Sequence, residues 1–117
     1  MREIIFYKTR TGKCPVTEFL DALNSKQAKK VAWVLSLIED MDLVPKEYYK
    51  KLTNTDDIWE VRIQLASDIF RVLGFPDSNH VVLTNGFVKK SQQTPRREIQ
   101  TAEQRKADYL TRKGERK

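Results

Sequence analysis

The sequence predicts an α+β fold in a single domain that spans residues 1–117. Three observations support this fold class. Residues 15–41 repeat apolar side chains at intervals of three and four, which is typical of amphipathic helices. Residues 58–88 contain three consecutive β-type runs joined by short turns, and residues 96–110 return to a helical pattern. We therefore expect two N-terminal helices packed on a twisted antiparallel sheet of about four strands, followed by a basic C-terminal helix.

The N-terminal half supplies one strand and both packing helices. Residues 2–7 form a short apolar run that indicates a strand. Pro15 suits the first turn of a helix, and Asn24 is a residue type that caps the next helix, which we expect from Lys26 to about Met41. An antiparallel pair of these helices would cover one side of the sheet. Residues 42–57 lack periodicity, and we interpret them as a linker.

The central region predicts the rest of the sheet. In residues 59–65 the apolar side chains alternate, so Glu60 and Arg62 share the face away from them. Arg71 is the only charge in the apolar run 69–75, where a charge is costly unless it is paired or used. Residues 80–88 are nearly continuously apolar, which is typical of a strand covered on both faces, at or near the centre of the sheet. Short connections favour antiparallel neighbours.

Positive charge is concentrated at the C-terminus. Residues 1–88 hold 12 Lys+Arg and 12 Asp+Glu, whereas residues 89–117 hold 10 and 4, so the net charge of +6 lies in the last 29 residues. Thr94 is expected to cap the final helix, and a basic tail is expected from about residue 112. A basic end on a neutral body is typical of proteins that bind nucleic acid, although a solvated helix with a frayed tail has the same composition.

Composition excludes several other classes. An apolar content of 39% argues against a disordered chain. The single cysteine, Cys14, cannot form an internal disulfide, and the chain opens with no signal-peptide pattern. No apolar stretch approaches the roughly 20 residues that cross a bilayer. These features predict a soluble, cytoplasmic protein without a membrane partner.

Several short motifs occur in a fixed order along the chain. They are Pro15-Val16-x-x-Phe19-Leu20, Trp59-Glu60-x-Arg62, Phe70-Arg71-Val72, Gly86-Phe87-x-Lys89-Lys90 and Thr94-Pro95 before a basic helix. In this order they resemble the HigB-like toxins of the RelE/ParE superfamily. The resemblance implies two N-terminal helices on a twisted antiparallel sheet, in agreement with the periodicity.

The same resemblance implies a function and partners. The expected protein is the toxin of a bacterial type II toxin–antitoxin system, a small ribosome-dependent mRNA endonuclease (mRNA interferase). Its expected partners are mRNA on the ribosome and a cognate helix-turn-helix antitoxin, HigA-like, in a higher-order oligomer that binds operator DNA.

The residues present limit the chemistry. Metal-free RNA cleavage uses the 2′-hydroxyl as nucleophile and needs a proton acceptor, a donor at the leaving 5′-oxygen and positive charge on the phosphate. His80 is the only histidine, and no Cys, His and carboxylate cluster has metal-ligand spacing, so no metal or other cofactor is predicted. Arginine forks match phosphate, and a lysine near other cations can act as an acid. The candidate catalytic residues are Arg62, Arg71, Lys89, Lys90 and Glu60, and the candidate RNA-binding residues are Lys50, Lys51, Arg96, Arg97, Arg105 and Lys106.

Alternative interpretations stay open for these residues. Arg62 also fits a surface strand residue that pairs with Glu60, and Glu60 fits a residue that orients Arg62 and accepts no proton. Alternation places only one of Lys89 and Lys90 on the arginine face, and the sequence does not identify which. Two other functions remain open: a ParE-like toxin that inhibits gyrase without nuclease activity, and an inert prophage-derived RNA-binding protein.

Overall fold

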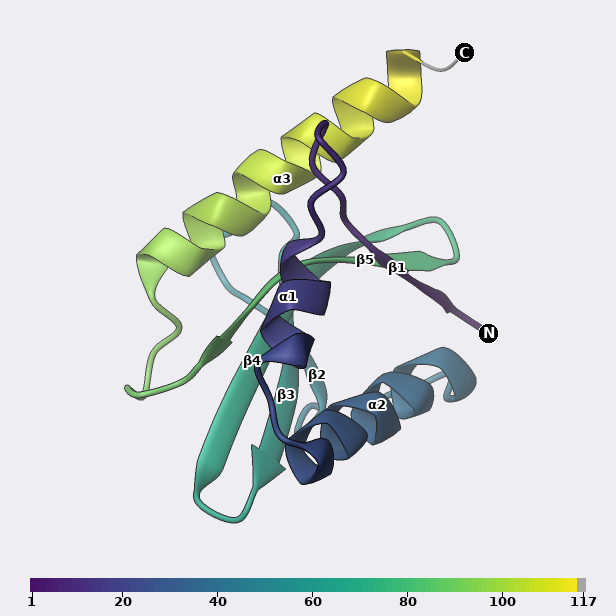
Figure 1. The fold of residues 1–117 in the computed structure, drawn as a ribbon. Helices are drawn as coiled ribbons and strands as arrows, with labels where there is room; N and C mark the ends of the chain where they lie inside the picture. The colour runs from purple at the N-terminus through teal and green to yellow at the C-terminus, as the bar shows by residue number, and fades with distance from the viewer. Residues whose placement is uncertain (116–117) are drawn as a thin grey trace.

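The computed structural model describes residues 1–115, which form a five-stranded mixed sheet between two helical layers (Figure 1). The strand order is β1-β5-β4-β3-β2. The elements are β1 (Glu3–Phe6), α1 (Pro15–Asp21), α2 (Ser25–Asp40), β2 (Tyr49–Lys51), β3 (Trp59–Leu65), β4 (Asp68–Asp77), β5 (His80–Val88) and α3 (Arg96–Glu115). The predicted α+β class in a single domain is confirmed. Within residues 1–115, no helix is both long and apolar enough to cross a membrane.

The sheet differs from the prediction in two ways. It has five strands, and it is mixed because β1 pairs in parallel with β5, from Glu3 opposite His80 to Phe6 opposite Leu83. The argument for antiparallel pairing rested on short connections, and it does not apply to strands separated by most of the chain. The interpretation of residues 42–57 as a linker was also wrong in part, because they contain β2, in which Tyr49 pairs with Val61 of β3.

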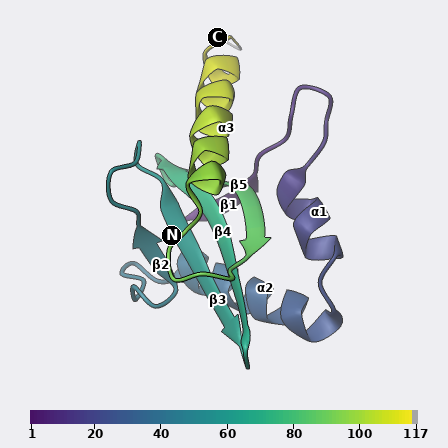
Figure 2. The same cartoon turned by 90° about the vertical axis from the view of Figure 1, so that its left-hand side faces the viewer.

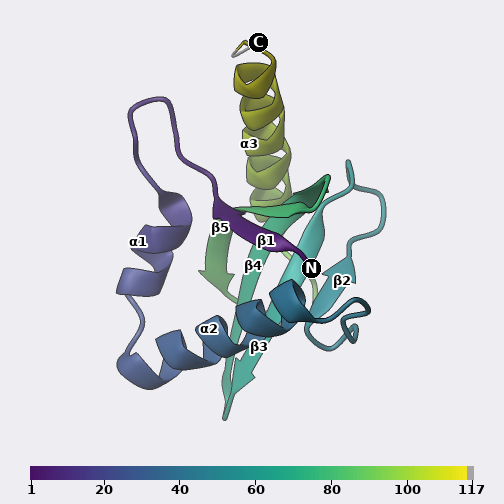
Figure 3. The same cartoon turned by 90° about the vertical axis from the view of Figure 1, so that its right-hand side faces the viewer.

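Helices α1 and α2 cover one face of the sheet. They form a corner rather than the expected antiparallel pair (Figure 3). The predicted cap of α2 is confirmed, because Asn24 and Gln27 form a reciprocal capping box, and the helix begins at Ser25, one residue before the predicted start. Gly86 allows α1 to approach β5 closely, since a Cβ at this position would lie 2.5 Å from the Phe19 ring. The buried core on this side includes Val16, Val31, Val34, Ile38, Val61, Ile63, Phe70 and Val72.

Helix α3 covers the opposite face (Figure 2). Ala102 is fully buried there against a second core that includes Leu73, Phe75 and Val82. Thr94 was predicted to cap this helix, but its hydroxyl is bonded elsewhere, as described below. The helix also continues to Glu115, past the point where a basic tail was expected.

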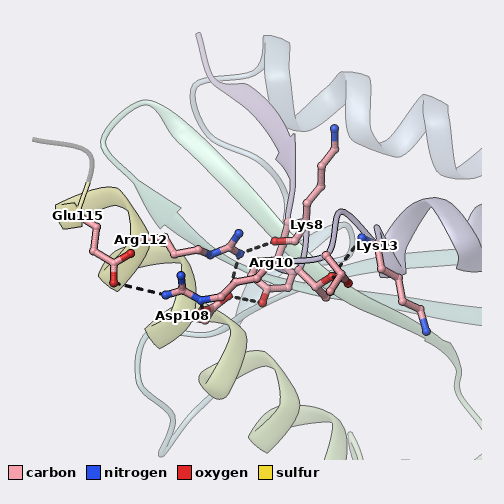
Figure 4. Close-up of polar contacts among 9 residues, drawn as sticks. Lys8, Arg10, Lys13, Asp108, Arg112 and Glu115 are labelled. Carbon is pink, nitrogen blue, oxygen red and sulfur yellow. Dashed lines mark hydrogen bonds and ion pairs between the residues drawn. The ribbon is translucent and has the colours of Figure 1, made fainter.

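Ion pairs hold the C-terminal half of α3 in place. Arg112 lies 2.7 Å from Asp108 and donates to the Lys8 carbonyl, while Arg10 lies within 3.5 Å of Asp108 (Figure 4). Lys113 forms a 2.6 Å pair with an aspartate in β4. The charges expected in a solvated tail are therefore used within the fold, apart from those of residues 116 and 117, which lie outside the described residues.

Candidate functional site

The sheet register gathers the predicted charges on one face. Arg62 of β3 lies directly opposite Arg71 of β4. Glu60 precedes Arg62 by two residues and so shares its face, and Lys50 of β2 lies opposite Glu60. The apolar residues of β3 pack in the core on the other face, as the alternation predicted. Residues from three strands thus form one polar cluster on the side of the sheet that carries α3.

Glu60 lies at the centre of this cluster. The residue is only 3% exposed. Its Oε1 lies 3.3 Å from Arg71 Nε and 3.5 Å from Arg62 Nε, and its Oε2 accepts a hydrogen bond from the Thr94 hydroxyl. Within residues 1–115, neither Nε makes a well-aligned hydrogen bond. Coulomb attraction to one shared carboxylate oxygen therefore holds the two arginines.

Arg71 is buried, with 6% of its surface exposed. Burial lowers the pKa of its guanidinium, and the Glu60 carboxylate opposes this shift. Arginine nevertheless remains charged at neutral pH. Its Nη1 donates to the Phe70 carbonyl over 2.9 Å. Because Arg71 lies in an apolar run, the sequence predicted that its charge is either paired or functional, and its pairing with Glu60 is confirmed.

Arg62 is more open, with a side chain 32% exposed. Its Nη1 lies 3.4 Å from the Lys46 carbonyl. Arg62 and Arg71 together line a pocket of about 270 Å³ at the sheet edge, to which Lys30 and Tyr48 also contribute. In the described part of the chain, no hydrogen bond engages Nη2 of either arginine. Nη2 of each guanidinium is therefore the nitrogen that has no protein partner there.

The structure distinguishes the two adjacent lysines. Both follow the end of β5, and the Lys89 amide donates to the Ile69 carbonyl over 2.8 Å. Burial lowers the pKa of the half-buried Lys89 ammonium, and Arg71 lowers it further. Lys90 is exposed. The Lys89 amide continues the pairing with β4, and Phe87, two residues earlier, lies opposite Arg71, so Lys89 is the lysine on the arginine face.

The predicted RNA-binding cations fall into two groups. Lys50, Arg96 and Arg97 are exposed and, within residues 1–115, form no ion pair. Arg96 and Arg97 occupy the first turn of α3, where a cation is unfavourable for the helix dipole. Their charges add to the positive potential of that helix end.

The second group is bound within the fold. Arg105 donates to the Thr84 carbonyl over 2.8 Å, and Lys106 donates to the Asp56 carbonyl over 2.7 Å. Lys51 lies 3.5 Å from an aspartate carboxylate. These three cations have partners within the fold. The cations that remain available to bind RNA therefore lie around residues 89–97 and on β2.

Thr94 is the residue of this site that sequence reasoning missed. Its hydroxyl donates to Glu60, 34 residues earlier in the chain. A threonine before Pro95 at the start of a helix has the local pattern of a cap, so the sequence carried no signal for the longer-range contact. Asn85 also ties β5 to α3, because its side-chain amide donates to Glu98 over 3.0 Å. Among residues 1–115, no three His, Cys, Asp or Glu side chains group where a metal ion would be held.

The described residues thus form a basic cluster on a mixed sheet, with two N-terminal helices on one face and a C-terminal helix on the other. The family model described as Phage derived protein Gp49-like (DUF891) matches residues 18–107, a range that includes every candidate catalytic and RNA-binding residue. The chain therefore belongs to the phage-derived Gp49-like family, a RelE-like family of toxin-like proteins in phages and toxin–antitoxin systems. No curated protein matches the chain.

Proposed function

We propose that the protein is a HigB-like toxin of a type II toxin–antitoxin system, and that it acts in the cytoplasm as a ribosome-dependent mRNA endonuclease without a metal or other cofactor. One observation carries the proposal. A single buried carboxylate, Glu60, holds two arginines opposite each other across neighbouring strands, with Lys89 beside them. Membership of a toxin-like family supports it.

The arrangement suggests a role for each residue. The Nη2 groups of Arg62 and Arg71 bind the scissile phosphate and stabilise the charge that develops on it. Lys89, whose pKa is lowered by burial and by Arg71, donates a proton to the leaving 5′-oxygen. Glu60 orients the arginines, because it is buried and both of its oxygens are occupied. The acceptor of the 2′-hydroxyl proton then lies outside these four residues, which fits a reaction completed on the ribosome.

The proposed partner is an antitoxin. A HigA-like helix-turn-helix protein would neutralise the toxin, and the complex would form a higher-order oligomer that binds operator DNA. Family membership supports this part of the proposal, and co-purification of the toxin with the product of an adjacent reading frame tests it.

A second candidate function is RNA binding without cleavage. It is favoured by the neutralisation of Arg71, whose buried guanidinium already has a carboxylate partner. In this case the exposed cations Arg96 and Arg97 would supply the affinity, and the sheet arginines would serve stability alone.

An in vitro translation assay separates the two functions. Purified protein is added to a translating extract, and message ends are mapped by primer extension. We expect new ends within the reading frame, which disappear when the start codon is mutated and when Lys89→Ala replaces the wild type. Lys90→Ala, with its exposed side chain, is the matched control and should cut normally. Intact message in an extract that binds the protein would favour RNA binding without cleavage.

A further inference from the structure

The free edge of β1 carries unpaired backbone groups. The amides of Glu3 and Tyr7 donate to the carbonyls of Asn79 and Leu83 beside β5, each over 2.9 Å. In a parallel ladder the bonding residues alternate, so the N–H and C=O groups of Ile4 and Phe6 point away from β5. Because β1 is the terminal strand of the sheet, no other strand among residues 1–115 pairs with them. These four groups can accept an added strand.

A groove of about 890 Å³ lies along this edge. Ile4 and Phe6 line it from the strand, Leu35 lines it from α2, and Tyr109 lines it from α3. In Figure 3, β1 lies between α2 and α3. A strand added here would place its alternate side chains against these apolar walls, since successive side chains of a strand point to opposite faces.

The charges at the two ends of the groove differ. Lys8 and Arg112 line the end beside Phe6, because Arg112 donates to the Lys8 carbonyl. Lys113 lies toward the Glu3 end, because it pairs with the aspartate at the end of β4 that is opposite His80, and His80 is opposite Glu3. Lys113 and Arg112 are both paired with aspartates. Lys8 is exposed and has no ion pair within residues 1–115 (Figure 4). Glu39 lines the groove at the Glu3 end, because its carbonyl accepts a hydrogen bond from the Arg2 amide. An occupant that is complementary in charge is acidic at the Lys8 end.

We propose that this groove binds an extended segment of another polypeptide, apolar at alternate positions and acidic at the end beside Lys8, which joins the sheet as a further strand next to β1. Main-chain hydrogen bonds to Ile4 and Phe6 supply affinity, and the groove and Lys8 supply specificity. A second copy of this chain fits poorly, because symmetric antiparallel pairing centred on Ile5 would place Lys8 opposite Arg2. The proposal does not depend on RNA cleavage.

The first test uses synthetic peptides and a proline variant. The probes are fluorescent eight-residue peptides that alternate valine and threonine, with two aspartates at either the N- or the C-terminal end. We expect one of them to bind the wild type in a fluorescence anisotropy titration. Ile4→Pro removes the N–H that points away from β5 and no hydrogen bond to β5, so the variant should keep the fold. It should bind the peptide about tenfold more weakly, or weaker still. Ile4→Val keeps the N–H and should bind as the wild type does, and thermal unfolding verifies that both variants are folded.

A second pair of measurements tests the pairing and the charge. The same peptide N-methylated at alternate residues keeps its composition and charge but loses the pairing N–H groups, and it should not bind. Lys8→Glu should weaken binding, whereas Lys29→Glu, exposed on α2 and outside the groove, should not. Equal binding by Ile4→Pro and wild type, or no binding of either probe, would overturn the proposal. If analytical sedimentation shows that the wild type is a dimer and that Ile4→Pro is a monomer, a second copy of this chain occupies the groove, and the proposal is overturned.

Discussion

Replacing Arg71 by alanine separates its structural role from its proposed catalytic role. Removing one partner of a buried ion pair commonly costs about 3–5 kcal/mol, because the other charge is left buried and unpaired. Here Glu60 would keep Arg62 at 3.5 Å and the Thr94 hydroxyl. We therefore expect the lower end of that range, a loss of about 3 kcal/mol in the free energy of unfolding. For a chain of this size, roughly 4 °C per kcal/mol gives a fall of about 12 °C in Tm.

We also expect folded molecules of Arg71→Ala to cleave RNA much more slowly than folded wild-type molecules. A cation that faces the transition-state phosphate commonly contributes about two to three orders of magnitude in rate. The assay is single-turnover cleavage of a ribosome-bound message, at a temperature where thermal unfolding shows the variant to be folded.

A double variant provides the matched control. Glu60→Leu with Arg71→Met removes both charges and fills a similar volume, so it should recover most of the lost stability. It should still fail to cleave. A Tm for Arg71→Ala within a few degrees of wild type would contradict the buried-pair reasoning, and cleavage by the double variant would remove Arg71 from the proposed phosphate site.

Three further results are expected. Arg96→Ala or Arg97→Ala should each reduce the slope of log binding constant against log salt concentration for RNA by about 0.7. Lys113→Ala should leave this slope unchanged, because the charge of Lys113 is paired. Filter binding at several salt concentrations measures the slope. If Lys89 is the acid, the cleavage rate should fall as pH rises through the lowered pKa of Lys89. Lys89→Arg should cleave slowly, and its rate should not show this fall at high pH in a pH–rate profile. A hydrogen bond from Tyr7 lowers the pKa of Asp108 below 3.8, so its contribution to stability is present above that pH and lost as pH falls through the folded pKa. Asp108→Asn should therefore lower Tm at neutral pH and reduce the dependence of Tm on pH in acid.

Local patterns predicted the elements of the fold better than their pairing. The alternation in residues 59–65 and the cap at Asn24 are properties of short segments, and the structure confirms both. The partner of β1 is not a local property, because the strand it pairs with is far away in the sequence. The three residues of β2 are too few to show an alternation. They form a strand because they pair with residues of β3, which lie outside the local pattern of residues 49–51.

For the candidate site, the sequence predicted the charges but not how they are held. An isolated Arg71 in an apolar run signals a paired or used charge, and strand alternation places Glu60 with Arg62. Alternation is no guide beyond Val88, where β5 ends, so the sequence could not choose between the two lysines that follow. The role of Thr94 depends on where the segment before α3 crosses the sheet, and that position is set by tertiary packing.

The electrostatics of the cluster link its stability to its proposed function. Two arginines directly opposite each other across neighbouring strands repel, and such pairs are destabilising unless a counter-charge is present. Glu60 supplies one negative charge for Arg62, Arg71 and the adjacent Lys89, so the cluster retains excess positive charge. A phosphate that reached the Nη2 groups of the two arginines would reduce this repulsion at the place where it binds. The repulsion that costs stability in the free protein would thus contribute affinity when a polyanion enters, which accounts for a charged cluster built into an otherwise apolar sheet.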